Sequence, residues 1–329
     1  MNRTPFIHHN RGKGRPQVLL IGNGLERGKN GQPEWSELLN ALRAPGVEKP
    51  TKEEEKLSFP LLYQLLSTPV PPPRMLDAEM IKSEEKRLAE GLKCLKHTSN
   101  PLLDRLPALG TDHILTTNYT YSLEAAFLPN HSFQSSSSRS SARFSLCLPG
   151  KDGRQRAERE YRLHSGYEAK NEDGSRVGLW HIHGETGTPR GIVVGHDRYG
   201  RLLSRMERLC GNELTQSRDE GEHEFRSWPE LFLFGDVYVL GFGFEPCEYD
   251  LWWLLRRKQR ERYADGCVYF FNNSRKPESA IRDRLLEAHG VYLNPCGVTK
   301  QADYTAFYNQ AMDVIAEQIR KKRSGGTAA

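Results

Sequence analysis

The stretch Gln17–Leu25, with the sequence Q-V-L-L-I-G-N-G-L, restricts the fold of this chain more than any other segment. The unbroken apolar run after Gln17 is typical of a strand buried on both faces of a parallel sheet. The glycines that follow allow a sharp turn, which brings backbone N–H groups close to a ligand. A helix is predicted next, at Trp35–Leu42, and the positive N-terminal end of such a helix favours a phosphate. The sequence therefore predicts the first unit of a nucleotide-binding α/β sheet.

The glycine pattern alone leaves two interpretations open. The dinucleotide-binding fingerprint G-x-G-x-x-G needs a third glycine at a fixed spacing and an acid about 20 residues later. Here Gly28 comes one residue late, and the segment Pro33–Leu42 favours a helix over a second strand that ends in an acid. The turn therefore either holds a nucleotide phosphate or is a tight turn that simply requires glycine.

The composition is that of a soluble globular protein, with 37% of the 329 residues hydrophobic and 27% charged. No apolar run approaches the ~20 residues of a membrane-spanning helix. Residues 1–16 are basic, lack the apolar core of a signal peptide, and are predicted to form a flexible arm. The six cysteines are scattered singly, which argues against a disulfide framework or a zinc ribbon and indicates a reducing cytoplasm. The net charge of +5 does not by itself indicate nucleic-acid binding.

Apolar segments that end in small or polar residues predict the sheet. The segment ends are Gly22–Gly24, Thr117–Asn118, Gly241–Gly243 and Asn272–Asn273. In an open parallel sheet these ends lie at one edge, where ligands bind. The predicted fold is therefore α/β, a Rossmann-like parallel sheet with helices on both faces, in one domain over residues 17–322.

Several stretches interrupt this pattern. Residues 49–100 contain helical segments and no strand, which predicts a helical insertion between the first two strands. Residues 131–176 combine a serine-rich run with alternating charges, which predicts an exposed loop and hairpin. A short strand is predicted at Gly191–Val194, and residues 323–329 are predicted to be a flexible tail.

The run Trp180–Gly184, W-H-I-H-G, contains two histidines that a strand would place on one face. One interpretation is a pair of partly buried histidines that bond backbone carbonyls. Another is a zinc ligand pair, although no cysteine cluster lies nearby. A third is a catalytic role for His183.

Asn118 ends the predicted strand H-I-L-T-T-N. It either caps the helix that follows or aims its amide at a water or a ribose hydroxyl. Because an amide is a poor base, the second interpretation requires a partner such as His183. No spaced pair of acids suggests glycoside hydrolysis by two carboxylates.

A basic run lies at the end of the helix predicted at Tyr249–Arg262. Its cations are Arg256, Arg257, Lys258, Arg260 and Arg262. Cations at a helix C-terminus oppose the negative end of the helix dipole, and no aromatic residues interleave within the run to stack on bases. The run therefore favours a solvated helix end over nucleic-acid binding.

Five short motifs follow one another in a particular order. They are I-G-N-G at 21–24, T-T-N-Y at 116–119, H-I-H-G at 181–184, V-L-G-F-G-F at 239–244 and F-F-N-N at 270–273. This order resembles the SIR2-like proteins of prokaryotic antiphage defence systems, which are similar to sirtuins in sheet topology. The resemblance covers about residues 17–275.

The resemblance implies a NAD⁺ site and assigns residues to it. Asn118 would position the attacking water at the nicotinamide ribose, with His183 beside it. The residues implied in cofactor binding are Gly22, Asn23, Gly24, Thr117, Gly241, Gly243 and Asn272. NAD is then the substrate, and no metal is expected.

True sirtuin deacylases carry a four-cysteine zinc module and a T-Q-N-I-D motif, and this chain has neither. The departures favour NAD⁺ cleavage to nicotinamide and ADP-ribose, as in SIR2-like hydrolases that deplete the cofactor during phage infection. The alternatives are a non-catalytic module that binds NAD or ADP-ribose, and a protein deacylase. The resemblance also implies a homo-oligomer and leaves room for a partner protein or ATPase of a defence system, with neither nucleic acid nor a membrane involved.

Overall fold

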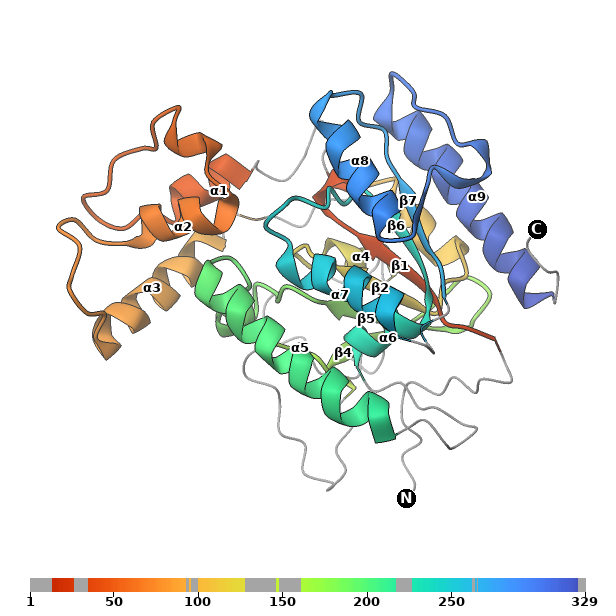
Figure 1. Ribbon diagram of the computed structural model, residues 1–329, viewed down its shortest axis with the longest axis horizontal. Coiled ribbons are helices and arrows are strands. Elements are labelled where there is room, and N and C mark those ends of the chain that lie inside the picture. The colour runs from red at the N-terminus through yellow and green to blue at the C-terminus, as the bar shows by residue number, and fades with distance from the viewer. Residues whose placement is uncertain are drawn as a thin grey trace.

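The computed structural model describes residues 14–26, 35–92, 95, 100–127, 146–147, 161–216, 227–261, 264 and 266–324. Within them, one sheet of eight strands runs in the order β3-β4-β5-β2-β1-β6-β7-β8 (Figure 1). The strands are β1 (Gln17–Ile21), β2 (His113–Thr116), β3 (Leu146–Cys147), β4 (Gly166–Lys170), β5 (Arg176–His181), β6 (Asp236–Leu240), β7 (Val268–Phe271) and β8 (Val291–Leu293). The strands from β5 to β8 in this order pair in parallel, whereas β3 and β4 pair antiparallel at one end.

Strand β1 lies in the middle of the sheet, between β2 and β6. Each of its residues is buried, because helices cover both faces and parallel neighbours occupy both edges. Leu20 pairs with Leu115 on one side and with Val239 on the other. The apolar run after the N-terminal segment thus forms the central parallel strand, as predicted.

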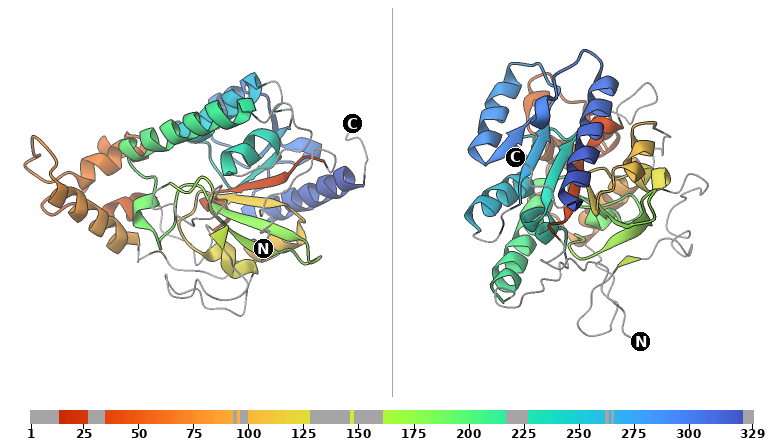
Figure 2. Two further views of the ribbon diagram at one scale, coloured as in Figure 1. Left: turned by 90° about the horizontal axis from the view of Figure 1, so that it is seen from below. Right: turned by 90° about the vertical axis from the view of Figure 1, so that its right-hand side faces the viewer.

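Helices cover both faces of this sheet, which confirms the predicted α/β, Rossmann-like fold. One face packs against α5 (His196–Gln216), α6 (Trp228–Phe234), α7 (Tyr249–Arg260) and α8 (Glu278–Ala288). The other packs against α4 (Ser122–Phe127), α9 (Tyr304–Arg323) and the 3₁₀ segment η5 (Leu103–Ala108). The left view of Figure 2 shows α5 and α9 on opposite sides of the sheet. Residues alternate between the two cores along β1, with Leu20 in the first and Leu19 in the second.

A helical block projects from one end of the sheet (Figure 1). It contains α1 (Trp35–Ala41), α2 (Phe59–Ser67) and α3 (Ala78–Gly91), which share a third apolar core. Tyr119, which follows β2, and Ile192, which follows β5, belong to the same core. The block therefore includes α1, outside the predicted bounds of 49–100, and it is packed onto the loops at the carboxyl edge of the sheet.

Two local predictions were wrong. Residues 166–170 form β4, which pairs antiparallel with β5 as a hairpin, but this hairpin belongs to the main sheet and is not an exposed one, and Tyr161 and Leu163 are buried in the first core. The apolar run Gly191–Val194 forms no strand, because Ile192 and Val194 pack into the core of the helical block. Residues 1–13, 131–145, 148–160 and 325–329, on which other predictions fall, lie outside the described residues.

No helix in the part of the chain that the structure describes combines the length and the apolar character needed to cross a bilayer.

Candidate functional site

A cavity of about 1030 Å³ opens at the carboxyl edge of the parallel strands. Its walls come from the segments after β1, β2, β5, β6 and β7, because the carboxyl ends of parallel strands meet at one edge of a sheet. Of the residues predicted to form a site, those that line it are Asn23, Gly24, Thr117, Asn118, His183, Gly241, Gly243 and Asn272. Gly22 is the exception and lies behind the wall.

The glycines after β1 allow two turns to touch. A Cβ on Gly24 would lie 2.6 Å from the Gly241 carbonyl oxygen, and one on Gly22 would lie 2.8 Å from the same atom. The Gly24 N–H donates to that oxygen over 2.8 Å, so it is engaged within the protein and does not face a ligand. Gly241 itself has φ of +68°, in the left-handed region that favours glycine. Glycine is thus required here for the close approach of β1 and β6, and Gly24 still forms part of the cavity wall.

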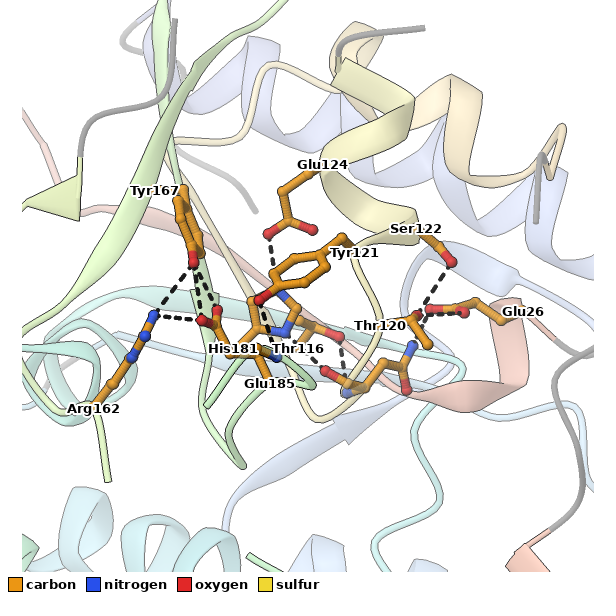
Figure 3. Close-up of polar contacts among 12 residues, drawn as sticks. Glu26, Thr116, Thr120, Tyr121, Ser122, Glu124, Arg162, Tyr167, His181 and Glu185 are labelled. Atoms are coloured by element: carbon orange, nitrogen blue, oxygen red, sulfur yellow. Dashed lines mark hydrogen bonds and ion pairs between the residues drawn. The ribbon is translucent and has the colours of Figure 1, made fainter. Parts of the chain in front are cut away.

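Asn118 is held by a carboxylate that sequence reasoning missed. Its side-chain nitrogen donates to Glu26 Oε1 over 2.5 Å, and Thr120 Oγ1 donates to Glu26 Oε2 over 3.2 Å (Figure 3). Burial raises the pKa of Glu26, although hydrogen bonds from Asn118, Thr120 and Ser122 oppose that rise. With the nitrogen engaged, the Asn118 side-chain oxygen remains to accept a bond from a molecule in the cavity. The sequence signal that could have identified Glu26 is an acidic residue two positions after Gly24.

His181 supports Asn118 from the other side. Its Nδ1 lies 2.8 Å from the Asn118 carbonyl oxygen and its Nε2 lies 2.8 Å from Glu124 Oε1 on α4. Burial lowers the pKa of His181, but the Glu124 carboxylate outweighs it and raises the pKa to about 9. As an imidazolium, His181 would donate from both nitrogens; Figure 3 shows its ring between Glu124 and the chain after β2. The interpretation of a buried histidine that bonds a backbone carbonyl therefore fits His181, which does not line the cavity.

His183 has a different environment, so the prediction that both histidines share one strand face was wrong. Strand β5 ends at His181, and the chain then turns at Gly184, which has φ of +91°. His183 lines the cavity, and its Nε2 lies 2.8 Å from Asp250 Oδ2 on α7. Burial lowers the pKa of His183, but Asp250 and Glu248 together raise it above its ordinary value.

Among the residues that the structure describes, His183 belongs to a group of three side chains that could hold a metal ion. Ligand atoms of His183, Glu248 and Asp250 all lie within 4.8 Å of one another. The pair considered from the sequence, His181 with His183, is not part of this group, because His181 bonds Glu124 and Asn118.

Asn272 shapes the other end of the cavity. Its side-chain nitrogen donates to both carboxylate oxygens of Asp283, over 3.1 and 3.0 Å, and its side-chain oxygen accepts from the Ser274 N–H over 2.9 Å. Arg282 Nη1 donates to the Gly243 carbonyl oxygen over 2.9 Å. These bonds fix the loops after β6 and β7 relative to α8.

The charges that line the cavity are unevenly distributed. Glu26 and Glu248 lie at the end formed by β1, β2 and β5, whereas Lys276 and Arg282 lie at the end formed by β7 and α8. Glu245 and Glu278 also line the cavity, and Glu278 lies on α8 beside the two cations, so acids occur at both ends and cations at the β7–α8 end.

A buried ion pair lies beside the site without lining it. Arg162 Nη1 lies 2.8 Å from Glu185 Oε1, and the Tyr167 hydroxyl donates to Glu185 Oε2 over 2.8 Å (Figure 3). Glu185, an acid close to the histidines in the sequence, is fully buried in this pair. It therefore supports the structure around His181 and is not exposed to a substrate.

The basic run on α7 is partly used inside the protein. Lys258 is buried and its Nζ donates to three carbonyl oxygens at the end of α6, those of Phe232, Leu233 and Gly235. Arg257 pairs with Glu261. The prediction of a solvated helix end is therefore wrong for Lys258, which binds the carbonyl end of α6, whereas Arg256 and Arg260 are exposed as predicted.

A comparison with protein-family models found no match for this chain. A comparison with curated proteins likewise found no match. The SIR2-like resemblance therefore remains a prediction from the order of the motifs.

Proposed function

We propose that this protein hydrolyses NAD⁺ at the bond between nicotinamide and ribose, and that it does so as an effector of antiphage defence. The observation that supports the proposal is that separately predicted residues meet at one cavity. Asn118 and His183, predicted for this chemistry from separate motifs, line one cavity together with the residues predicted to bind the cofactor. Its volume of about 1030 Å³ lies at the upper end of the range typical of small-molecule and cofactor sites.

Lys276 and Arg282, which line the cavity at the end formed by β7 and α8, suggest an orientation for the substrate. The nicotinamide ring of NAD⁺ is cationic and its pyrophosphate is anionic. A dinucleotide laid along the sheet edge would place the ring near Glu26 and Glu248 and the phosphates toward Lys276 and Arg282. Hydroxyl and amide groups of the loops between them would face the riboses.

The reaction requires few functional groups from the protein. Nicotinamide leaves as a neutral molecule from a cationic pyridinium, so its departure needs no general acid. The protein must orient the ribosyl bond, exclude bulk water and place one water at C1′. Asn118, held through its nitrogen by Glu26, offers its side-chain oxygen to that water.

Release of nicotinamide and ADP-ribose from NAD⁺ by the purified protein tests this function. We expect release by the wild type, and a loss of activity in Asn118→Ala and His183→Ala variants that keep the wild-type melting temperature. If calorimetry detects no binding of NAD⁺ at all, the site assignment is wrong. Binding without release would instead favour a non-catalytic NAD or ADP-ribose module.

A further inference from the structure

We propose that His183 and Glu248 bind a divalent transition-metal cation in the cavity, that Asp250 orients His183 for this role, and that the bound cation and NAD⁺ exclude each other. The exclusion rests on the proposed NAD⁺ hydrolysis, whereas the metal site itself does not. The inference departs from the SIR2-like resemblance, which implies that no metal takes part.

The three residues that form the site meet only in the folded protein. His183 follows β5, Glu248 directly precedes α7, and Asp250 lies in the first turn of that helix. Ligand atoms of the three side chains all lie within 4.8 Å of one another. The side chains of His183 and Asp250 are 3% and 0% exposed, and that of Glu248 is 14% exposed. The packing around them therefore fixes the group, while His183 and Glu248 still line the cavity.

The group carries more negative charge than its surroundings compensate. Among the described residues, the ion-pair partner of both Glu248 and Asp250 is His183, and no lysine or arginine pairs with either carboxylate. Even a protonated His183 would leave one of the two carboxylates uncompensated. Asp250 Oδ1 also lacks a hydrogen-bond partner in the described part of the chain. Because buried charges without a partner are unfavourable, the group favours a bound cation.

The spacing of two atoms in the group suits a metal ion. His183 Nδ1 lies 3.7 Å from Glu248 Oε2, which is too far for a hydrogen bond. Two ligands of a tetrahedral zinc ion, each about 2.1 Å from the metal, lie about 3.4 Å apart. A cation can therefore bridge this nitrogen and the Glu248 carboxylate with little movement of either side chain. The Tyr199 hydroxyl, which donates to Oε2 over 2.9 Å, holds the carboxylate in place.

Asp250 contacts the other nitrogen of the His183 ring. Its Oδ2 lies 2.8 Å from His183 Nε2, so a neutral imidazole that donates there keeps a lone pair on Nδ1. Histidines that bind metals usually donate their second N–H to a carboxylate in this way. With His183 neutral, the two carboxylates balance the charge of one divalent cation. A nitrogen ligand beside a carboxylate suits Zn²⁺ or Mn²⁺, whereas Mg²⁺ and Ca²⁺ prefer oxygen ligands alone.

The metal site lies at the end of the cavity where the proposed function places the nicotinamide ring. His183 and Glu248 line that end together with Asn118. The metal ion and the nicotinamide ring are both cationic, so they repel each other when they share the Glu248 carboxylate. The cation therefore acts as a competitive inhibitor of NAD⁺ cleavage.

Calorimetric titration of the chelator-treated protein with Zn²⁺ tests the metal site without NAD⁺. We expect one equivalent to bind per chain and the affinity to fall by about 10- to 100-fold in Asp250→Asn, which changes only a supporting partner. Glu248→Gln removes a ligand and should lower the affinity further, although glutamine keeps the size of the side chain and still accepts from Tyr199. Zn²⁺ should also raise the melting temperature of the wild type and leave that of Glu248→Gln unchanged.

Two matched controls separate the site from charge and from scattered histidines. Glu245→Gln removes an acid that lines the cavity outside the group, and His289→Gln removes a histidine on the far side of α8 from the group. Both variants should bind Zn²⁺ as tightly as the wild type. Equal Zn²⁺ affinity in the wild type and Glu248→Gln, or no binding by the wild type, overturns the metal site.

Binding of NAD⁺ to the Zn²⁺-loaded and the chelator-treated protein tests the exclusion. We expect bound Zn²⁺ to weaken NAD⁺ binding by about 5- to 150-fold, the usual range of coupling between two ligands. In the nicotinamide-release assay, Zn²⁺ should raise KM and leave kcat unchanged. Equal NAD⁺ affinity in the two forms, or activity that a chelator abolishes and Zn²⁺ restores, overturns the exclusion. If the chelator-treated protein does not bind NAD⁺, the proposed function and the exclusion fail together, and the Zn²⁺ titration alone decides the metal site.

Discussion

The side-chain amide of Asn118 and the carboxylate of Glu26 form a hydrogen bond of 2.5 Å between the loops after β2 and β1. The contact decides which end of the amide faces the cavity. A carboxylate only accepts hydrogen bonds, so the Asn118 nitrogen must point toward Glu26 and the oxygen away from it.

Replacing Glu26 by glutamine should release this constraint. The glutamine amide can donate as well as accept, so the Asn118 side chain is no longer fixed in one orientation. We expect kcat for nicotinamide release to fall about 10- to 100-fold, in line with other groups that orient catalytic residues, with little change in melting temperature. Thr120→Val removes the longer bond to the same carboxylate and should have a smaller effect. Wild-type kcat in Glu26→Gln would show that the amide needs no such support.

The contact between His181 and Glu124 should make stability depend on pH. The folded pKa of His181, about 9, lies above its ordinary value of 6.5, so the contact contributes fully below pH 6.5 and is lost as the pH rises through 9. The difference corresponds to about 3 kcal/mol in the free energy of unfolding. Urea unfolding at pH 6.5 and 9.5 measures it. His181→Gln should remove most of this dependence, whereas His289→Gln, at the end of α8, should keep it.

Alanine at position 24 should destabilise the turn after β1. Its Cβ would lie 2.6 Å from the Gly241 carbonyl oxygen and 2.8 Å from the Tyr308 hydroxyl, and the backbone atom cannot easily move away. We expect a loss of about 1–3 kcal/mol in the free energy of unfolding. Gly200→Ala is the matched control, because a Cβ there meets no atom within 4 Å. Since Gly200 lies in α5, that change should be neutral or slightly stabilising, and equal effects of the two substitutions would contradict the packing argument.

Replacing Lys258 by methionine should leave three buried carbonyl groups without their shared donor. We expect the free energy of unfolding to fall by roughly 3 kcal/mol or more, because hydrogen bonds from charged donors are strong and the carbonyls stay buried. Arg260→Met, at an exposed position of the same helix, should change stability by less than about 0.5 kcal/mol. Thermal unfolding of the two variants side by side provides the comparison.

Much of the fold follows from local sequence. The apolar run of β1 and the segments that end at Thr117–Asn118, Gly241–Gly243 and Asn272–Asn273 already imply a parallel sheet with one ligand-binding edge. The strands β1, β2, β6 and β7 bear this out. The placement of Asn118 and His183 at one cavity follows from the same argument, since both come after parallel strands.

The parts of the site and fold that could not be predicted from the sequence depend on contacts between segments that are far apart in the chain. Glu26 becomes a partner of Asn118 only when the loops after β1 and β2 meet, and Asp250 reaches His183 from the start of α7. His181 and His183 lie in different environments because β5 ends at His181. The alternation of side chains along a strand does not reveal where a strand ends. Gly191–Val194 is apolar enough for a strand, yet it is buried against helices.

Tyr119 links the helical block to the loop that carries Asn118. It directly follows Asn118, its ring belongs to the apolar core of the block, and its hydroxyl donates to the Val193 carbonyl oxygen over 2.9 Å. The peptide that presents Asn118 is therefore anchored in the block as well as in the sheet. Any force or ligand that pulls α1–α3 away from the sheet acts on the same anchor, so the integrity of the block and the competence of the cavity are thermodynamically coupled.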